Sequence, residues 1–112
     1  MIKAIFFDID GTLVSFETHS IPQSTIETLA RLRQSGIKLF IATGRQFGLI
    51  NNLQGIEFDG YVTINGAITL VGGQIIDKHP IAKDQIEAAC EYIDKKKSFP
   101  CTFVMADRIA IN

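Results

Sequence analysis

The sequence predicts an α/β fold built on a parallel sheet, and three neighbouring segments carry that prediction. Residues 2–7 form a nearly continuous apolar run rich in Ile and Phe, which is typical of a parallel strand covered on both faces. Apolar residues at helical spacing follow from position 26, after Pro22 and before Gly36, two residues that favour a helix start and stop. Residues 37–42 are again apolar and predict a second strand. Strand, helix and strand in this order make a right-handed βαβ unit.

The next segments extend the same sheet. Spacing of apolar residues predicts a short second helix over residues 46–53, and an apolar run predicts a third strand over residues 60–64. A Gly-Gly pair then separates two short apolar segments, residues 67–71 and 74–77. Two glycines between such segments predict a β-hairpin.

The pattern changes after Pro80. An amphipathic helix is predicted next, followed by two strands at residues 101–105 and 108–111. We therefore expect two domains: an incomplete α/β core over residues 1–80 and the beginning of a second α/β unit over residues 81–112.

Composition excludes several classes of partner. The 112 residues carry a formal net charge of −1, which offers no electrostatic reason to bind nucleic acid or a membrane surface. The one charge run, Lys95-Lys96-Lys97, is typical of a helix end. No apolar stretch is long enough to span a bilayer, and the N-terminal run is interrupted by Lys3, unlike a signal peptide. Cys90 and Cys101 lack metal-site spacing, so we expect buried thiols and a cytoplasmic protein.

Two acidic residues, Asp8 and Asp10, end the first predicted strand and precede Gly11. An Asp-Gly turn explains Asp10 structurally, but it does not explain a second carboxylate at Asp8, which is expected within the apolar strand, where burying a charge is costly unless it is compensated. A carboxylate can instead take a phosphoryl group as a covalent intermediate, and a second one can act as general acid and base. The attacking carboxylate and the phosphate are both anionic, so a hard divalent cation with oxygen ligands, typically Mg²⁺, is needed to screen their charges.

Two further stretches converge on the same edge of the sheet as the acidic pair. The backbone N–H groups at Gly11 can receive phosphate oxygens, and Thr43, at the end of the second strand, can add a hydroxyl donor. Asn65 follows the third strand. Ligands of open α/β sheets lie beyond the carboxyl ends of the strands, where all these residues are predicted.

Other acidic or glycine-rich sites fit less well. A calcium loop that began at Asp8 would need Gly at its sixth and Glu at its twelfth position, which hold Leu13 and His19. No Gly-Lys-Ser/Thr segment follows the first strand, so a P-loop is excluded. A receiver-type signalling domain would need a phosphoacceptor Asp at the end of the third strand, whereas Asp59 precedes that strand and Asn65 follows it.

The combined motifs resemble a known family. Asp8-Ile9-Asp10-Gly11-Thr12-Leu13 resembles the first signature of the haloacid dehalogenase (HAD) superfamily, and Ile41-Ala42-Thr43-Gly44-Arg45 resembles the second. The Ile21-Pro22 segment and Ile64-Asn65-Gly66-Ala67 are similar to the Cof-like branch, whose members often dephosphorylate sugar phosphates and related metabolites. The resemblance implies a Rossmann-like core sheet with an inserted α/β cap domain.

The resemblance also implies roles for single residues. Asp8 would be the nucleophile and a Mg²⁺ ligand, and Asp10 the general acid and base, with its backbone carbonyl on the metal. Thr43 would bind the transferring phosphoryl group, and Gly44 would let the backbone turn close to it. Arg45 would contact the substrate or the cap, or form a surface ion pair. Asn65 would lie near the hinge between core and cap, or cap a turn.

Family elements that follow the cap have no match in the chain. A catalytic Lys and a Gly-Asp-x-x-Asn-Asp type segment are both expected after the cap, and Lys95 and Asp107 do not match them. We therefore expect the chain to be the N-terminal part of a longer phosphatase for small phosphorylated metabolites, with little activity alone and with self-association through an unfinished sheet edge. The alternative is a non-catalytic HAD-like module that binds phosphate, metal or a protein partner.

Overall fold

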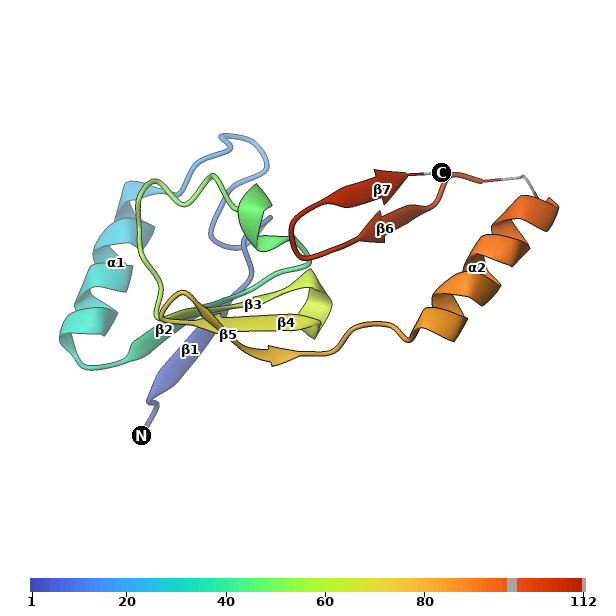
Figure 1. Cartoon of the computed structure of the whole chain (residues 1–112). Helices are drawn as coiled ribbons and strands as arrows, with labels where there is room; N and C mark the ends of the chain where they lie inside the picture. Colours follow the sequence, from blue (N-terminus) through green and yellow to red (C-terminus); the bar gives the residue numbers. More distant parts are fainter. Residues whose placement is uncertain (97–98, 112) are drawn as a thin grey trace.

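A five-stranded sheet and a separate helix-hairpin unit make up the computed structural model, which describes residues 1–96 and 99–111 (Figure 1). The sheet has the order β1-β2-β3-β4-β5, in which β1, β2 and β3 are parallel while β4 and β5 are antiparallel. Its strands and helices are β1 (Ala4–Phe7), α1 (Gln23–Gln34), β2 (Lys38–Ala42), β3 (Gly60–Thr63), β4 (Ile68–Val71) and β5 (Gln74–Lys78), with short 3₁₀ turns η1 (Phe47–Leu49) and η2 (Ile64–Gly66). The predicted α/β class is confirmed, and the sheet is mixed rather than wholly parallel.

The predicted βαβ unit is present as β1, α1 and β2. Pro22 directly precedes α1 with a φ of −59°, and Gly36 follows the helix with a φ of +80°, which glycine adopts without steric cost. The hairpin is also confirmed. Gly72 and Gly73 connect β4 to β5, with φ values of +58° and +78°.

Most of the core lies between α1, the connecting loops and one face of the sheet. Its fully buried side chains include Ile9, Leu39 and Ile41. On β1 the burial is one-sided: Phe6 is 58% exposed and stacks on Phe40 with ring centroids 4.8 Å apart. The prediction that this first strand is covered on both faces is therefore wrong, because within the described residues α1 is the only long helix against the sheet and it covers one face.

Two further sequence predictions are corrected by the structure. The helix expected over residues 46–53 is reduced to the three residues of η1, because Gly48 and the following Asn pair disfavour helix interiors. Cys90 is exposed and Cys101 half-buried, so the expected burial of the thiols is wrong.

Residues 79–82 lead from the sheet to the second unit, which comprises α2 (Lys83–Lys96), β6 (Thr102–Val104) and β7 (Ile109–Ile111). β6 and β7 pair in antiparallel fashion as a sheet of their own, and α2 lies at the end of the molecule opposite α1 (Figure 1). Lys95 and Lys96 occupy the last turn of α2, as predicted, while Lys97 lies outside the described residues. No helix in the described ranges is long and apolar enough to cross a membrane.

Candidate active site

The acidic segment forms a tight turn directly after β1. The Val14 N–H donates to the carbonyl oxygen of Ile9 at 2.9 Å, and the Gly11 N–H donates to the carbonyl oxygen of Val14 at 2.9 Å. Gly11 has a φ of +79°, so the reversal needs a residue without a Cβ. The Gly11 N–H is occupied within the turn and does not face a ligand in this conformation. The contribution of Gly11 seen here is to shape the turn.

Asp8 lies at the end of β1 and is exposed. Its Oδ1 accepts a hydrogen bond from the Ile9 N–H at 2.8 Å, which orients the carboxylate. The expected burial of the Asp8 carboxylate is therefore wrong, because Asp8 follows the last residue of β1 and is exposed. An exposed and oriented carboxylate remains suited to bind a cation or attack a phosphate.

Asp10 forms a bidentate ion pair with Arg45. The Arg45 Nε donates to Oδ2 at 2.8 Å and Nη2 donates to Oδ1 at 2.6 Å, while Nη1 donates to the carbonyl oxygen of Leu49 at 3.1 Å. The hydrogen bonds from Arg45 hold the pKa of Asp10 below its ordinary value, despite an opposing effect of burial. Of the roles considered for Arg45, the structure shows an ion pair, and its partner is the second acidic residue of the motif.

The end of β2 meets the same edge of the sheet. β1 and β2 are parallel and pair Phe7 with Ile41, so the register brings Asp8 level with Ala42, the residue before Thr43. Thr43 is buried, and its Oγ1 accepts a hydrogen bond from the Arg45 N–H at 3.1 Å. The Thr43 hydroxyl hydrogen stays available for a ligand oxygen.

Asn65 lies in η2, at the end of β3, and completes the group. Its N–H donates to the carbonyl oxygen of Thr43 at 3.2 Å, and its side-chain Oδ1 lies against Gly44. The structure therefore brings together residues from three separate stretches of sequence at one edge of the sheet: Asp8, Asp10 and Gly11; Thr43, Gly44 and Arg45; and Asn65. Sequence reasoning missed the pairing of Arg45 with Asp10 and the contact of Asn65 with Gly44, because neither leaves a local pattern.

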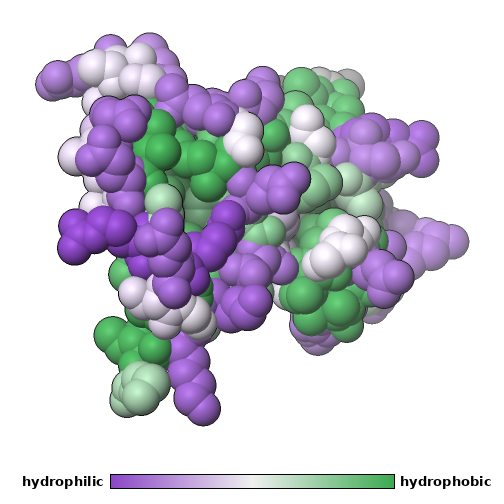
Figure 2. All heavy atoms as spheres, turned by 90° about the vertical axis from the view of Figure 1, so that its left-hand side faces the viewer, coloured by the Kyte–Doolittle hydropathy of each residue, from purple (hydrophilic) through white to green (hydrophobic). Residues whose placement is uncertain are grey.

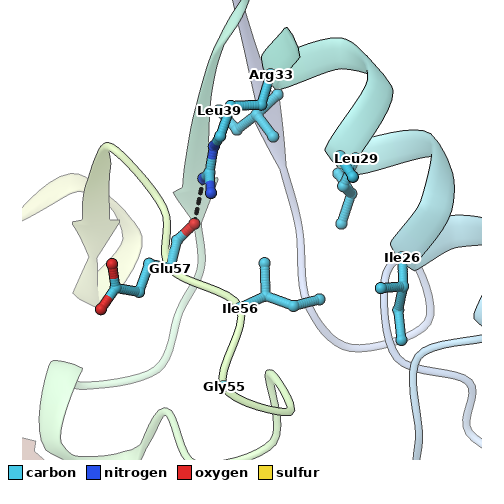
Figure 3. Close-up of a pocket in the computed structure, with 8 residues that line it drawn as sticks. Ile26, Leu29, Arg33, Leu39, Gly55, Ile56 and Glu57 are labelled. Carbon is cyan, nitrogen blue, oxygen red and sulfur yellow. Dashed lines mark hydrogen bonds between the residues drawn. The ribbon is translucent and has the colours of Figure 1, made fainter.

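A cavity lies away from this group of residues. It has a volume of about 350 Å³ and lies between α1 and residues 55–57, with Leu29, Leu39 and Ile56 among its lining residues (Figure 3). The side chain of Arg33 crosses its upper part and donates to the carbonyl oxygen of Glu57. Seen from the α1 side, hydrophobic atoms reach the surface between polar side chains (Figure 2). None of the predicted site residues lines this cavity.

The oxygen donors of the acidic turn fit a hard cation such as Mg²⁺. Mg²⁺ binds through one or two carboxylates and keeps several water ligands, and the exposed Asp8 carboxylate meets that requirement. Among residues 1–96 and 99–111, no three His, Cys, Asp or Glu side chains gather into a metal-binding group. Of the two acidic side chains of the turn, Asp8 is exposed, whereas the Asp10 carboxylate is occupied by Arg45.

Comparisons with known proteins identify the family of the chain. The family model of haloacid dehalogenase-like hydrolases matches residues 5–112. A candidate phosphatase of Bacillus subtilis (strain 168), YkrA, is 34% identical over 106 residues, covering 94% of this chain and 40% of its own length. An HMP-PP phosphatase of Shigella flexneri is 33% identical over 90 residues, covering 78% of this chain and 33% of its own length. The chain thus spans about two fifths or less of these curated relatives.

Solved structures show the same fold. The HAD subclass IIB sugar phosphatase BT4131 is 49% identical with a TM-score of 0.88, covering 97% of this chain and 43% of its own. The phosphatase BT1666 from Bacteroides thetaiotaomicron is 34% identical with a TM-score of 0.92, covering 100% of this chain and 42% of its own. With the family model matching nearly the whole chain and both acidic residues at the end of β1, the chain belongs to the haloacid dehalogenase-like hydrolases.

Proposed function

We propose that this chain carries the nucleophile and the phosphate-binding part of a Mg²⁺-dependent phosphatase. The observation that carries the proposal is the meeting of Asp8, the Asp10–Arg45 pair and Thr43 at the carboxyl ends of two parallel strands. Because ligands of open α/β sheets bind at such ends, the acidic turn and the Thr43 hydroxyl are placed to act on one phosphate group.

In the first step, a carboxylate oxygen of Asp8 attacks phosphorus. The bond from phosphorus to the leaving alkoxide breaks, and an aspartyl phosphate forms. In the second step, water attacks this phosphorus, and the Asp8 carboxylate and inorganic phosphate are released. The Thr43 hydroxyl donates to a phosphoryl oxygen in both steps.

Asp10 acts as general acid in the first step and general base in the second. The ion pair with Arg45 favours the ionised carboxylate, which is the form that accepts a proton from water. Protonating the leaving alkoxide requires Asp10 to separate from Arg45 and take up a proton. The Asp10–Arg45 ion pair therefore corresponds to the ionised form of Asp10, which is the form that acts as general base.

Mg²⁺ would be held by the Asp8 carboxylate and the Asp10 backbone carbonyl, and when bound it screens the charges of carboxylate and phosphate. The substrate is a small phosphorylated metabolite of the sugar-phosphate type, in line with the sugar phosphatase and HMP-PP phosphatase among the similar proteins. We further propose a core domain over residues 1–80, the beginning of a cap domain over residues 81–112, and a cytoplasmic location.

Phosphate release from a panel of sugar phosphates, with Mg²⁺ or with a chelator, tests this function in the complete gene product. Asp8→Asn should reduce turnover to background, because the amide is a poor nucleophile. Asp94→Asn is the matched control, since Asp94 is an exposed residue of α2 remote from the acidic turn, and it should retain wild-type turnover. Mg²⁺ or phosphate binding without any turnover would instead support the non-catalytic alternative.

A further inference from the structure

Three consecutive residues of η2 have left-handed backbone conformations. Ile64, Asn65 and Gly66 have φ values of +51°, +53° and +96°. Glycine adopts this region freely and Asn tolerates it, but a β-branched residue such as Ile64 is strained there. Such strain persists only where surrounding contacts hold it, and it is frequent at functional sites.

Two main-chain hydrogen bonds hold the turn against the segment that follows β2. The Ile64 N–H donates to the carbonyl oxygen of Arg45 at 3.1 Å, and the Asn65 N–H donates to the carbonyl oxygen of Thr43 at 3.2 Å. The strained turn is therefore hydrogen-bonded to Thr43 and to Arg45, the two residues that flank Gly44.

A side-chain contact fills the space between these two hydrogen bonds. A Cβ added to Gly44 would lie 2.9 Å from the Oδ1 of Asn65, closer than real Cβ contacts come. Gly44 does not have a left-handed φ, so its backbone does not require glycine. The need for glycine at position 44 comes from the Asn65 amide that lies against its Cα.

We propose that Gly44 is a positioning residue: with no side chain, it leaves room for the Asn65 amide, so that the strained turn does not displace the Arg45 guanidinium from Asp10 or the Thr43 hydroxyl from the edge of the sheet. The catalytic consequence rests on the proposed phosphatase function, whereas the structural consequence does not. A small displacement of Thr43 and Arg45 is expected to cost about 10- to 100-fold in kcat, because transferring groups tolerate little misplacement.

A double-mutant cycle tests the contact. Gly44→Ala should displace Arg45, because the new methyl group meets the Asn65 amide. Adding Asn65→Gly should return Arg45 to its wild-type position. Glycine at position 65 keeps the left-handed φ of the turn and removes the amide that the new methyl group would meet. Gly48→Ala is the matched control: no atom lies within 4 Å of its added Cβ, and Gly48 has no left-handed φ.

The first readout is the Arg45 Nε–H resonance of the 112-residue chain, which reports the hydrogen bond to Asp10. We expect Gly44→Ala to shift it, the double variant to return it to the wild-type position, and Gly48→Ala to leave it in place. An unshifted signal in Gly44→Ala, or no return in the double variant, would overturn the proposal.

The second readout is turnover in the complete gene product. Gly44→Ala should lower kcat about 10- to 100-fold with a smaller change in KM, and the double variant should regain most of that loss. An equal loss in both variants would contradict positioning by this contact. If Asp8→Asn keeps full turnover, the phosphatase mechanism fails, and the Arg45 resonance still decides the positioning role.

Discussion

The guanidinium of Arg45 holds both carboxylate oxygens of Asp10, with nitrogen–oxygen distances of 2.6 and 2.8 Å. The two residues are 35 positions apart in the sequence and follow different strands of the sheet. Lysine could not replace Arg45 here, because only the planar guanidinium offers two parallel donors to one carboxylate. The pair links the two signature segments of the chain.

Removal of the two hydrogen bonds from the Arg45 guanidinium should raise the pKa of Asp10. The hydrogen bonds from Arg45 are the largest cause of the lowered pKa, so Arg45→Ala should raise it, and the opposing effect of burial remains. Arg45→Lys should give an intermediate Asp10 pKa, because lysine keeps the positive charge but cannot donate two parallel hydrogen bonds to the carboxylate. Carboxyl chemical shifts recorded against pH in metal-free buffer measure both variants. An unchanged Asp10 pKa in Arg45→Ala would show that the ion pair does not persist in solution.

Gly11→Ala should destabilise the acidic turn for two separable reasons. Its φ of +79° costs an L-residue about 1–2 kcal/mol, and the new Cβ would lie 2.4 Å from the Cε2 atom of Phe16. Gly72→Ala is the matched control, because Gly72 also has a positive φ but no atom lies within 4 Å of its added Cβ. Denaturant unfolding should show the larger loss for Gly11→Ala.

Phe16 accounts for that difference. Because its ring is 70% exposed, Phe16→Ala alone should change stability by less than about 0.5 kcal/mol. In the Gly11→Ala background, the same change should remove the clash and leave only the backbone cost. A double variant no more stable than Gly11→Ala would mean that the Phe16 ring moves away freely.

Asp59 should make stability depend on pH. Its Oδ2 accepts the Leu39 N–H at 2.8 Å and its Oδ1 accepts Lys38 Nζ at 3.2 Å. The backbone hydrogen bond from Leu39 is the largest cause of its lowered pKa. Since the folded pKa lies below the unfolded one, this contribution to stability is complete above about pH 5 and is lost as the pH falls through the folded pKa.

Unfolding curves between pH 7 and pH 2 measure that dependence. Asp59→Ala should lose about 1–2 kcal/mol at pH 7 and show a flatter pH dependence than wild type. Lys38→Met should have the smaller effect, because it removes only the second, exposed partner. Equal pH dependence in wild type and Asp59→Ala would assign the acid sensitivity to other carboxylates.

The open edge of β1 should promote self-association of the 112-residue chain. In the described structure β1 pairs only with β2, and Phe6, which stacks on Phe40, is exposed. An unpaired strand beside an apolar surface favours edge-to-edge association. Sedimentation velocity over a wide concentration range should show reversible oligomers that Phe6→Lys weakens. Tyr92→Lys, at an exposed aromatic of α2, should not weaken them, and a monomer at the highest concentration would refute the expectation.

Local patterns predicted much of the fold. The apolar runs identified β1, β2 and β3, helical spacing identified α1 and α2, and the Gly-Gly pair identified the β4–β5 hairpin. These elements follow from hydrophobic periodicity and turn chemistry, which operate over a few residues. The failure at residues 46–53 has the same physical basis, because apolar spacing alone did not outweigh Gly48 and the following Asn pair.

The sequence by itself determined the two acidic residues after an apolar strand, the second motif after the next strand, and hence the family. Only the tertiary structure decided that Asp8 is exposed, that Arg45 pairs with Asp10, and that Gly44 makes room for Asn65. These relationships join residues from different strand ends, so they depend on strand register and on the left-handed turn after β3. Register and packing are properties of the assembled sheet and leave no signal in the spacing of residues along the chain.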